Sequence, residues 1–167
     1  ELVKVPYLRR YGEECEIYRP VVNERTVGRH IAPHAIEIAS LWTVLTRMRR
    51  NDPKRYSKEV GGVIEDLSPI DKMRLYDTGD VPVHLSARLG KELKQIIPEL
   101  YRESSNYPNY EGRFGASARE IRTAMLNAAH SEAYQCLSPF AVLSELEAIL
   151  ESKSVYDFLK QDVVGKF

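Results

Sequence analysis

A predicted helix start at residues 117–120 carries the residues whose types and spacing point most clearly to chemistry. The run Ser-Ala-Arg-Glu has the form of a capping box, in which the Ser117 hydroxyl accepts a hydrogen bond from the Glu120 amide and the Glu120 carboxylate accepts one from the Ser117 amide. Arg119 would then lie in the first turn, where exposed amides and the helix dipole attract anions. A guanidinium there can bind a phosphate and stabilise the charge of a transferring phosphoryl group. The sequence leaves a second interpretation open, in which Arg119 is solvated or pairs with an acid such as Glu120.

The histidines and cysteines of the chain do not form a recognisable metal-binding pattern. His30 and His34 are four residues apart, a spacing that would place both imidazoles on one face of a helix. Pro33 lies between them, so the helix is not expected to include His30, and no third ligand stands out. Cys15 and Cys136 are far apart and in no motif, which is typical of free thiols in a reducing compartment. We therefore expect no metal site.

The signatures of self-contained enzymes are absent from the sequence. It contains no G-x-x-x-x-G-K-[ST] loop, no G-x-G-x-x-G run, and neither the H-R-D nor the D-F-G motif of protein kinases. It also lacks a G-x-S-x-G elbow and a C-x-x-C pair, and its carboxylates are spread without an evident acid–base pair. No set of nucleophile, base and ligands supports a small independent enzyme, so we do not expect this chain to catalyse a reaction alone.

The composition is that of a globular domain with no general affinity for polyanions or lipid. Of the 167 residues, 43% are hydrophobic and 29% are charged, and the formal net charge is zero. Surfaces that bind nucleic acid or membranes usually need an excess of Lys and Arg, and the chain has no apolar run long enough to span a bilayer. We expect a cytoplasmic protein that binds neither nucleic acid nor membranes. We also expect a piece of a longer polypeptide, because the chain begins at Glu1 rather than Met.

The hydrophobic pattern predicts a mainly α-helical, bundle-like fold after a short extended segment at the N-terminus. The longest predicted helix covers 35–49, with Pro33 in its first turn and apolar residues at spacings of three and four. The cationic residues Arg47, Arg49 and Arg50 suit the negatively polarised C-terminal end of this helix. Its apolar stripe consists of Ile38, Leu41, Trp42, Leu45 and Met48.

Serine residues mark the starts of other predicted helices. Ser68 and Ser138 each precede a proline, so the hydroxyl can cap free amides while the proline takes a position that needs no donor. A further helix is predicted over 86–97. The polar stretch 101–115 is predicted as a loop, and a last helix is predicted to begin at 155–159.

The stretch 111–129, which reads EGRFGASAREIRTAMLNAA, resembles the PrkA-type serine protein kinases of bacteria. Proteins of that family pair an AAA-type ATPase module with a C-terminal region once likened to cyclic-AMP-dependent kinase. Three further segments are similar to the family in the same order, so the resemblance covers most of the chain. They are Val5-Pro6-Tyr7 with Glu13, Glu14, Ile17 and Tyr18, then His30-Ile31-Ala32-Pro33 before the Trp42 helix, and Lys72-Met73-Arg74-Leu75-Tyr76-Asp77.

The resemblance implies a division of the chain into three parts. Residues 1–22 would end the ATPase core and serve as its connector, 23–135 would form the helical AAA-type lid, and 136–167 would lead into the C-terminal region. The expected partners are the ATPase core of the same protein and a protein substrate. The resemblance also leaves open a ring of identical subunits in which the lid contacts its neighbour.

The resemblance further implies how the chain would serve an ATPase. In AAA proteins the third lid helix opens with an arginine, called sensor 2, whose side chain reaches over to the nucleotide phosphates. Arg119 occupies that place, with Ser117 as the cap of its helix, Arg122 as a weaker candidate and Arg113 as a loop contact. The Walker A and Walker B strands, sensor 1 and the arginine finger are not in this chain. ATP and Mg²⁺ would therefore be bound in the longer protein, an ATP-dependent serine protein kinase or ATPase, and not by this chain alone.

A function of a different class is also open. The chain could be a helical protein–protein interaction module without a nucleotide role. Its partner surfaces would then be the loop 101–110, which contains several tyrosines, and the basic cluster of Arg47, Arg49 and Arg50, because aromatic side chains and arginines are common at interface hot spots. Arg119 separates the two hypotheses, since only the first gives it a role in ATP hydrolysis.

Overall fold

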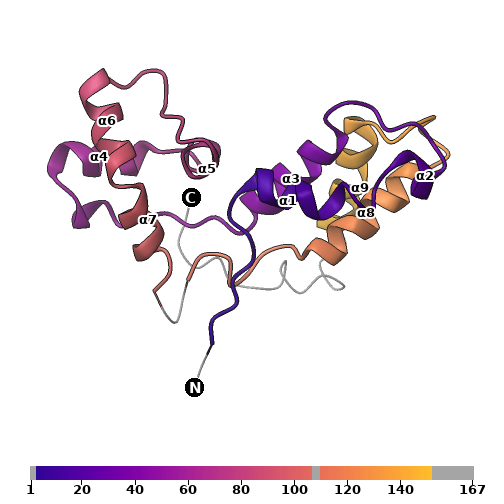
Figure 1. Cartoon of the computed structure of the whole chain (residues 1–167), viewed down its shortest axis with the longest axis horizontal. Coiled ribbons are helices and arrows are strands. Elements are labelled where there is room, and N and C mark those ends of the chain that lie inside the picture. The colour runs from indigo at the N-terminus through magenta and orange to yellow at the C-terminus, as the bar shows by residue number, and fades with distance from the viewer. Residues whose placement is uncertain (1–2, 107–109, 152–167) are drawn as a thin grey trace.

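The computed structural model describes residues 3–106 and 110–151, and its regular structure is helical (Figure 1). The elements are α1 (Tyr11–Tyr18), α2 (Glu24–Val27), α3 (Ala35–Leu45), the 3₁₀ turn η1 (Pro53–Arg55), α4 (Lys58–Asp66), α5 (Pro69–Asp77), α6 (Ala87–Gln95), α7 (Ile97–Glu103), α8 (Ala118–His130) and α9 (Pro139–Glu151). Within the described ranges there is no strand beyond one isolated bridge between Ile31 and Leu137. The prediction of a mainly α-helical fold with a short extended N-terminal segment is confirmed.

The helices gather into two lobes, as Figure 1 shows. The first lobe contains α1, α2, α3, α8 and α9, and the second contains α4 to α7. The chain passes from the first lobe to the second after α3 and returns after α7. Each lobe encloses its own cluster of buried hydrophobic side chains. The first lobe therefore forms only when residues from both ends of the described chain meet.

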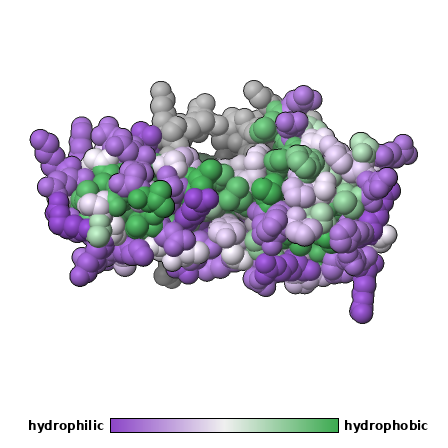
Figure 2. All heavy atoms as spheres, turned by 90° about the horizontal axis from the view of Figure 1, so that it is seen from above, coloured by the Kyte–Doolittle hydropathy of each residue, from purple (hydrophilic) through white to green (hydrophobic). Residues whose placement is uncertain are grey.

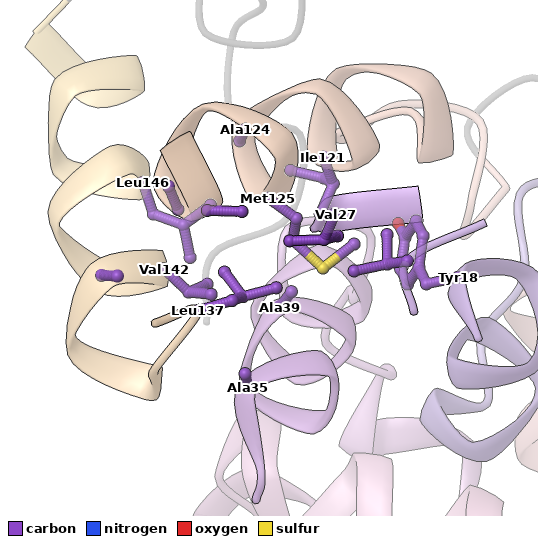
Figure 3. Close-up of a cluster of buried hydrophobic side chains, with 14 of the residues drawn as sticks. Tyr18, Val27, Ala35, Ala39, Ile121, Ala124, Met125, Leu137, Val142 and Leu146 are labelled. Carbon is purple, nitrogen blue, oxygen red and sulfur yellow. The ribbon is translucent and has the colours of Figure 1, made fainter. Parts of the chain in front are cut away.

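Small side chains allow the helices of the first lobe to approach one another closely. Ala35 and Ala39 of α3 are fully buried and lie near the side chains of α9 (Figure 3). The Met125 side chain of α8 points toward Val27 and Tyr18, which belong to α2 and α1 (Figure 3). Met125 and Tyr18 are both 0% exposed. This core joins α1–α3 to α8 and α9 by hydrophobic burial, the main favourable contribution to folding.

The second lobe packs four short helices around a smaller core. Met73 and Leu75 of α5, Leu93 of α6 and Leu100 of α7 are each at most 1% exposed. The rings of Tyr76 and Tyr101 lie with their centroids 4.1 Å apart, which adds an aromatic contact between α5 and α7.

The prediction for residues 35–49 is partly wrong. The helix α3 ends at Leu45, and Pro33 precedes its N-cap residue His34, which has a φ of 68°. The helix also contributes to both lobes. Its fully buried positions are Ala35, Ala39, Ser40, Thr43 and Val44. The predicted stripe is divided instead, with Ile38 and Trp42 partly buried against the first core and Leu41 and Leu45 partly buried against the second.

The predicted serine caps are confirmed. The hydroxyls of Ser68 and Ser138 each accept a hydrogen bond from the amide three residues on, at 3.1 and 3.2 Å. Ser86, for which no cap was predicted, accepts one from the Leu89 amide at 3.3 Å. The helix predicted over 86–97 corresponds to α6, and α7 follows it from Ile97 onward. The loop predicted over 101–115 is partly wrong, because α7 continues into it. The helix predicted at 155–159 lies outside the described residues.

The described surface is mixed in polarity. In Figure 2, hydrophilic side chains surround smaller hydrophobic areas on both lobes. The most exposed aromatic side chain of the first lobe is Phe140 of α9, at 74%. None of the helices within 3–106 and 110–151 is long and apolar enough to cross a membrane.

Candidate functional site

The start of α8 has the geometry of a complete capping box, as predicted. The Glu120 amide donates to the Ser117 Oγ at 3.3 Å, and the Ser117 amide donates to the Glu120 Oε2 at 2.7 Å. The backbone of Ser117 is extended, with φ −82° and ψ 151°, so the helix begins at Ala118. The Glu120 carboxylate is thereby used by the backbone, which argues against the alternative in which it serves as the partner of Arg119.

Arg119 is exposed in the first turn of this helix, and Arg122 is exposed three residues further on. Among the described residues, neither side chain makes a hydrogen bond or an ion pair. Positions three apart on a helix are neighbours on its surface, so the two guanidinium groups share one side of α8. Arg113 lies on the preceding loop, with its guanidinium over the ring of Phe114 at 4.8 Å. The start of α8 thus presents positive charge beside its free amides.

The backbone that leads into α8 is held by residues from the end of α3. The Arg47 Nε and Nη2 both donate to the Ala116 carbonyl, at 3.0 and 2.8 Å. The Ala116 amide donates to the Thr46 Oγ1 at 2.9 Å. Gly115 adopts a φ of 123°, and a Cβ there would lie 2.5 Å from the Arg47 Cγ, so a side chain at this position would collide with Arg47.

Arg47 is itself fixed by a buried, bidentate ion pair with Glu14. Its Nη1 lies 2.7 Å from the Glu14 Oε2 and its Nη2 lies 3.0 Å from the Oε1, and both side chains are 1% exposed. The Nη1 also donates to the Leu8 carbonyl at 3.0 Å. The Tyr18 hydroxyl completes the group by donating to the Glu14 Oε1 at 2.6 Å. The pKa of the Tyr18 phenol is raised mainly by burial and, to a smaller extent, by the hydrogen bond to the Glu14 carboxylate.

A second buried ion pair lies beside the first and involves the other lobe. The Lys72 Nζ of α5 donates to the Glu111 Oε1 at 2.6 Å and also to the Arg49 carbonyl. The same Glu111 oxygen accepts a hydrogen bond from the Arg49 amide at 2.7 Å. The Arg9 Nη1 lies 3.7 Å from the Glu111 Oε2, as an ion pair. Burial lowers the pKa of Lys72, while the Glu111 carboxylate opposes that shift.

The sequence of this chain matches two sequence models of one protein family. Residues 1–56 match the PrkA AAA domain, and residues 70–165 match the PrkA serine protein kinase C-terminal domain. This chain belongs to the PrkA family of serine protein kinases. The border between the two matches falls between α3 and α5, whereas the first core combines α1–α3 from the AAA match with α8 and α9 from the C-terminal match. The two matched regions therefore share one hydrophobic core.

Curated relatives agree with this membership of the PrkA family. The chain is 36% identical over 77 residues to the "ATP-dependent protease PrkA" of Bacillus subtilis (strain 168), covering 46% of this chain and 10% of that protein. It is 27% identical over 181 aligned residues to the "Serine/threonine kinase YeaG" of Escherichia coli (strain K12), covering 99% of this chain and 24% of that protein. The chain thus spans about a quarter or less of the length of these relatives. No solved structure matches the chain.

Arg47, Arg49 and Arg50, which the sequence suggested as a basic helix end or a partner surface, differ in their exposure in the structure. Arg47 is 2% exposed and belongs to the buried ion pair, Arg49 is partly buried, and Arg50 is exposed. The interpretation of these residues as one exposed cluster is wrong, because Glu14 and the Ala116 carbonyl draw Arg47 into the interior. Sequence reasoning missed this role because Glu14 and Arg47 are far apart in the chain, and a buried ion pair has no local pattern.

The two histidines that the sequence places four residues apart have different surroundings. The His30 Nδ1 lies 2.7 Å from a carboxylate oxygen of Glu24 on the surface, and His34 is the N-cap residue of α3. No group of three or more metal-ligating side chains occurs within the part of the chain that the structure describes. Both cysteines are free; Cys15 is buried in α1, and Cys136 is partly buried.

Replacing Glu14 by Gln should lower the free energy of unfolding by about 3–5 kcal/mol, because the Arg47 guanidinium would remain buried without a counter-charge. The matched control is Glu13→Gln on the same helix, where a side chain that is 53% exposed pairs with Arg10 at 3.6 Å. That change should cost less than about 1 kcal/mol. Urea unfolding followed by circular dichroism measures the free energy of unfolding of both variants. Similar losses in the two would contradict the role of Glu14 as the buried counter-charge of Arg47.

The raised pKa of Tyr18 predicts a loss of stability at alkaline pH. The unfolded chain releases the phenol proton near the ordinary pKa of about 10, whereas the folded chain retains it. The free energy of unfolding should therefore fall as the pH rises above that value. Tyr18→Phe removes this group, so its free energy of unfolding should fall less steeply between about pH 9 and about pH 11 than that of the unchanged protein. Urea unfolding at a series of pH values measures both slopes, and equal slopes would rule out this role for Tyr18.

Proposed function

We propose that this chain forms the helical lid of a PrkA-type ATPase and serine protein kinase, and that Arg119 contacts the phosphates of ATP from the start of α8. The observation that carries this proposal is the state of Arg119: an exposed guanidinium in the first turn of a fully capped helix, with no partner among the described residues. The first-turn amides that the capping box does not use, the helix dipole and the positive charge of Arg119 together attract a phosphate group.

In this proposal the chain supplies binding and charge stabilisation but not the remaining catalytic parts. Arg119 would stabilise negative charge on the transferring phosphoryl group, and Ser117 would keep the helix start in place as its cap. Arg122 would reinforce the positive potential from the next turn. ATP and Mg²⁺ would be held mainly by the ATPase core of the longer protein, which is also the proposed partner of this chain.

Family membership supports the proposal at the level of the whole protein. The matches to the PrkA AAA domain and to the PrkA C-terminal domain are those expected of a segment beside an ATPase core. The predicted limits of core end, lid and C-terminal region at 1–22, 23–135 and 136–167 stay predictions, as do a cytoplasmic location, a protein substrate and a ring of subunits.

The competing hypothesis of an interaction module without a nucleotide role has lost part of its basis. Arg47, one of its proposed surface cations, is buried, and Tyr101 is a partly buried residue of α7 rather than a loop residue. Tyr107 and Pro108 lie outside the described residues. Among the described residues, the exposed Phe140 of α9 still suits a protein partner.

Arg119→Ala in the full-length protein should lower the kcat of ATP hydrolysis by about 100-fold, the usual effect of removing one group that stabilises transition-state charge. Arg25→Ala is a matched control, because Arg25 is exposed and is also the second residue of a helix with a capping box, α2. Steady-state ATPase assays measure both variants. Equal activity of Arg119→Ala and Arg25→Ala would favour the interaction module.

The isolated chain should bind ATP with Mg²⁺ only weakly, with a Kd no tighter than about 1 mM, or about −4 kcal/mol. A lid provides one side of a nucleotide site and lacks the phosphate-binding loop that supplies most of the contacts. Isothermal titration calorimetry of the isolated chain with ATP and ADP, in the presence of Mg²⁺, measures this Kd. Micromolar binding would mean that the chain holds a complete nucleotide site, and the lid proposal would have to be abandoned.

A further inference from the structure

We infer that Arg47 and Thr46 are positioning residues for Arg119, an inference that rests on the proposed function and extends it to residues in the interior. Neither residue is exposed to a nucleotide: Arg47 is 2% exposed and Thr46 is partly buried. Both contact the peptide segment that leads into α8, three residues before Arg119.

The contacts hold both polar groups of Ala116, the residue just before the helix cap. Its carbonyl accepts two hydrogen bonds from the Arg47 guanidinium, at 3.0 and 2.8 Å, and its amide donates to the Thr46 Oγ1 at 2.9 Å. Ala116 is 0% exposed. Because its amide and its carbonyl are both fixed, Ala116 cannot rotate or shift without leaving buried polar groups unpaired, which is costly.

Arg47 connects Ala116 to the N-terminal part of the chain. Its guanidinium is held by both carboxylate oxygens of Glu14 and by the Leu8 carbonyl. Leu8 and Glu14 lie in the region that matches the AAA domain, whereas Ala116 and Arg119 lie in the region that matches the C-terminal domain. Together with the shared hydrophobic core, this side chain therefore fixes the start of α8 relative to residues of the AAA match.

The functional consequence comes from the sensitivity of catalysis to geometry. A charged group that is displaced by about 1 Å from its place beside a reacting phosphate can lose about 100-fold in rate. Because the Arg119 side chain is exposed, it does not hold its own backbone in place. The position of that backbone therefore depends on how the start of α8 is held. Loosening Ala116 would thus lower catalysis through Arg119 without removing any group that touches ATP.

The test is a set of double-mutant cycles in the full-length protein, with kcat and KM for ATP as the readout. Arg47→Lys keeps the charge but loses the fork that grips both Glu14 and Ala116, and we expect it to lower kcat about 10-fold. Thr46→Val removes the acceptor of the Ala116 amide, and we expect a loss of about threefold. In the Arg119→Ala background each change should alter kcat by less than about twofold, because the residue it positions is gone.

Ser40→Ala is the matched control, because Ser40 is a buried residue of α3 whose hydroxyl donates to the Ile36 carbonyl of the same helix at 2.9 Å. It should leave kcat unchanged in both backgrounds. Circular dichroism checks that each variant is folded, and Thr46→Val keeps the test available if Arg47→Lys does not fold.

The outcomes separate this inference from the proposed function. If Arg119→Ala lowers kcat but the Arg47 and Thr46 variants lower it by the same factor in both backgrounds, or not at all, the positioning role is wrong and the function of Arg119 stands. If Arg119→Ala leaves kcat unchanged, the proposed function fails and the positioning role fails with it. If the Arg47 and Thr46 variants lower kcat only in the protein that retains Arg119, the result supports both the positioning role and the proposed function.

Discussion

The Arg47–Glu14 ion pair is the interaction on which the arrangement of the first lobe depends. It joins the end of α3 to α1, to the segment near Leu8 and to the peptide before α8, through hydrogen bonds that are all shorter than or equal to 3.0 Å. Arginine suits this role because its planar guanidinium can donate in several fixed directions at once, which lysine cannot do. Both charges are withdrawn from water, so each is tolerated only while the other is present.

The charged residues lie between two hydrophobic cores rather than inside either one. Glu14 and Arg47 border the first core, and Lys72 and Glu111 link α5 of the second lobe to the segment that returns to the first. Burying such pairs costs desolvation energy that the attraction between them only partly offsets, so they are weak sources of stability. Their hydrogen bonds are directional, however, and they define how the connecting segments cross between the lobes, which hydrophobic contacts alone would specify less sharply.

The two regions matched by the family are not independent folding units in this structure. Ala35 and Ala39 from the AAA match pack with Leu137 and Val142 from the C-terminal match. A segment that ended at residue 56 would leave the apolar faces of α3 uncovered. Any rigid-body movement of this lobe would therefore carry α1, α3, α8 and α9 together, because a densely packed core is not continuously deformable.

The sequence by itself determined the features that depend on neighbouring residues, whereas only the tertiary structure decided where α3 ends and what Arg47 does. The caps at Ser68 and Ser138 and the capping box at Ser117 were predicted correctly, because each joins a residue to an amide three positions away. Local pattern also continued α3 to residue 49, but the helix stops at Leu45 and the Arg47 side chain turns inward to Glu14 and Ala116. Those partners are 33 and 69 residues away in the sequence. Periodicity and capping act over a single turn of helix, so they carry no information about a buried charge whose partner is brought to it by the packing of distant helices.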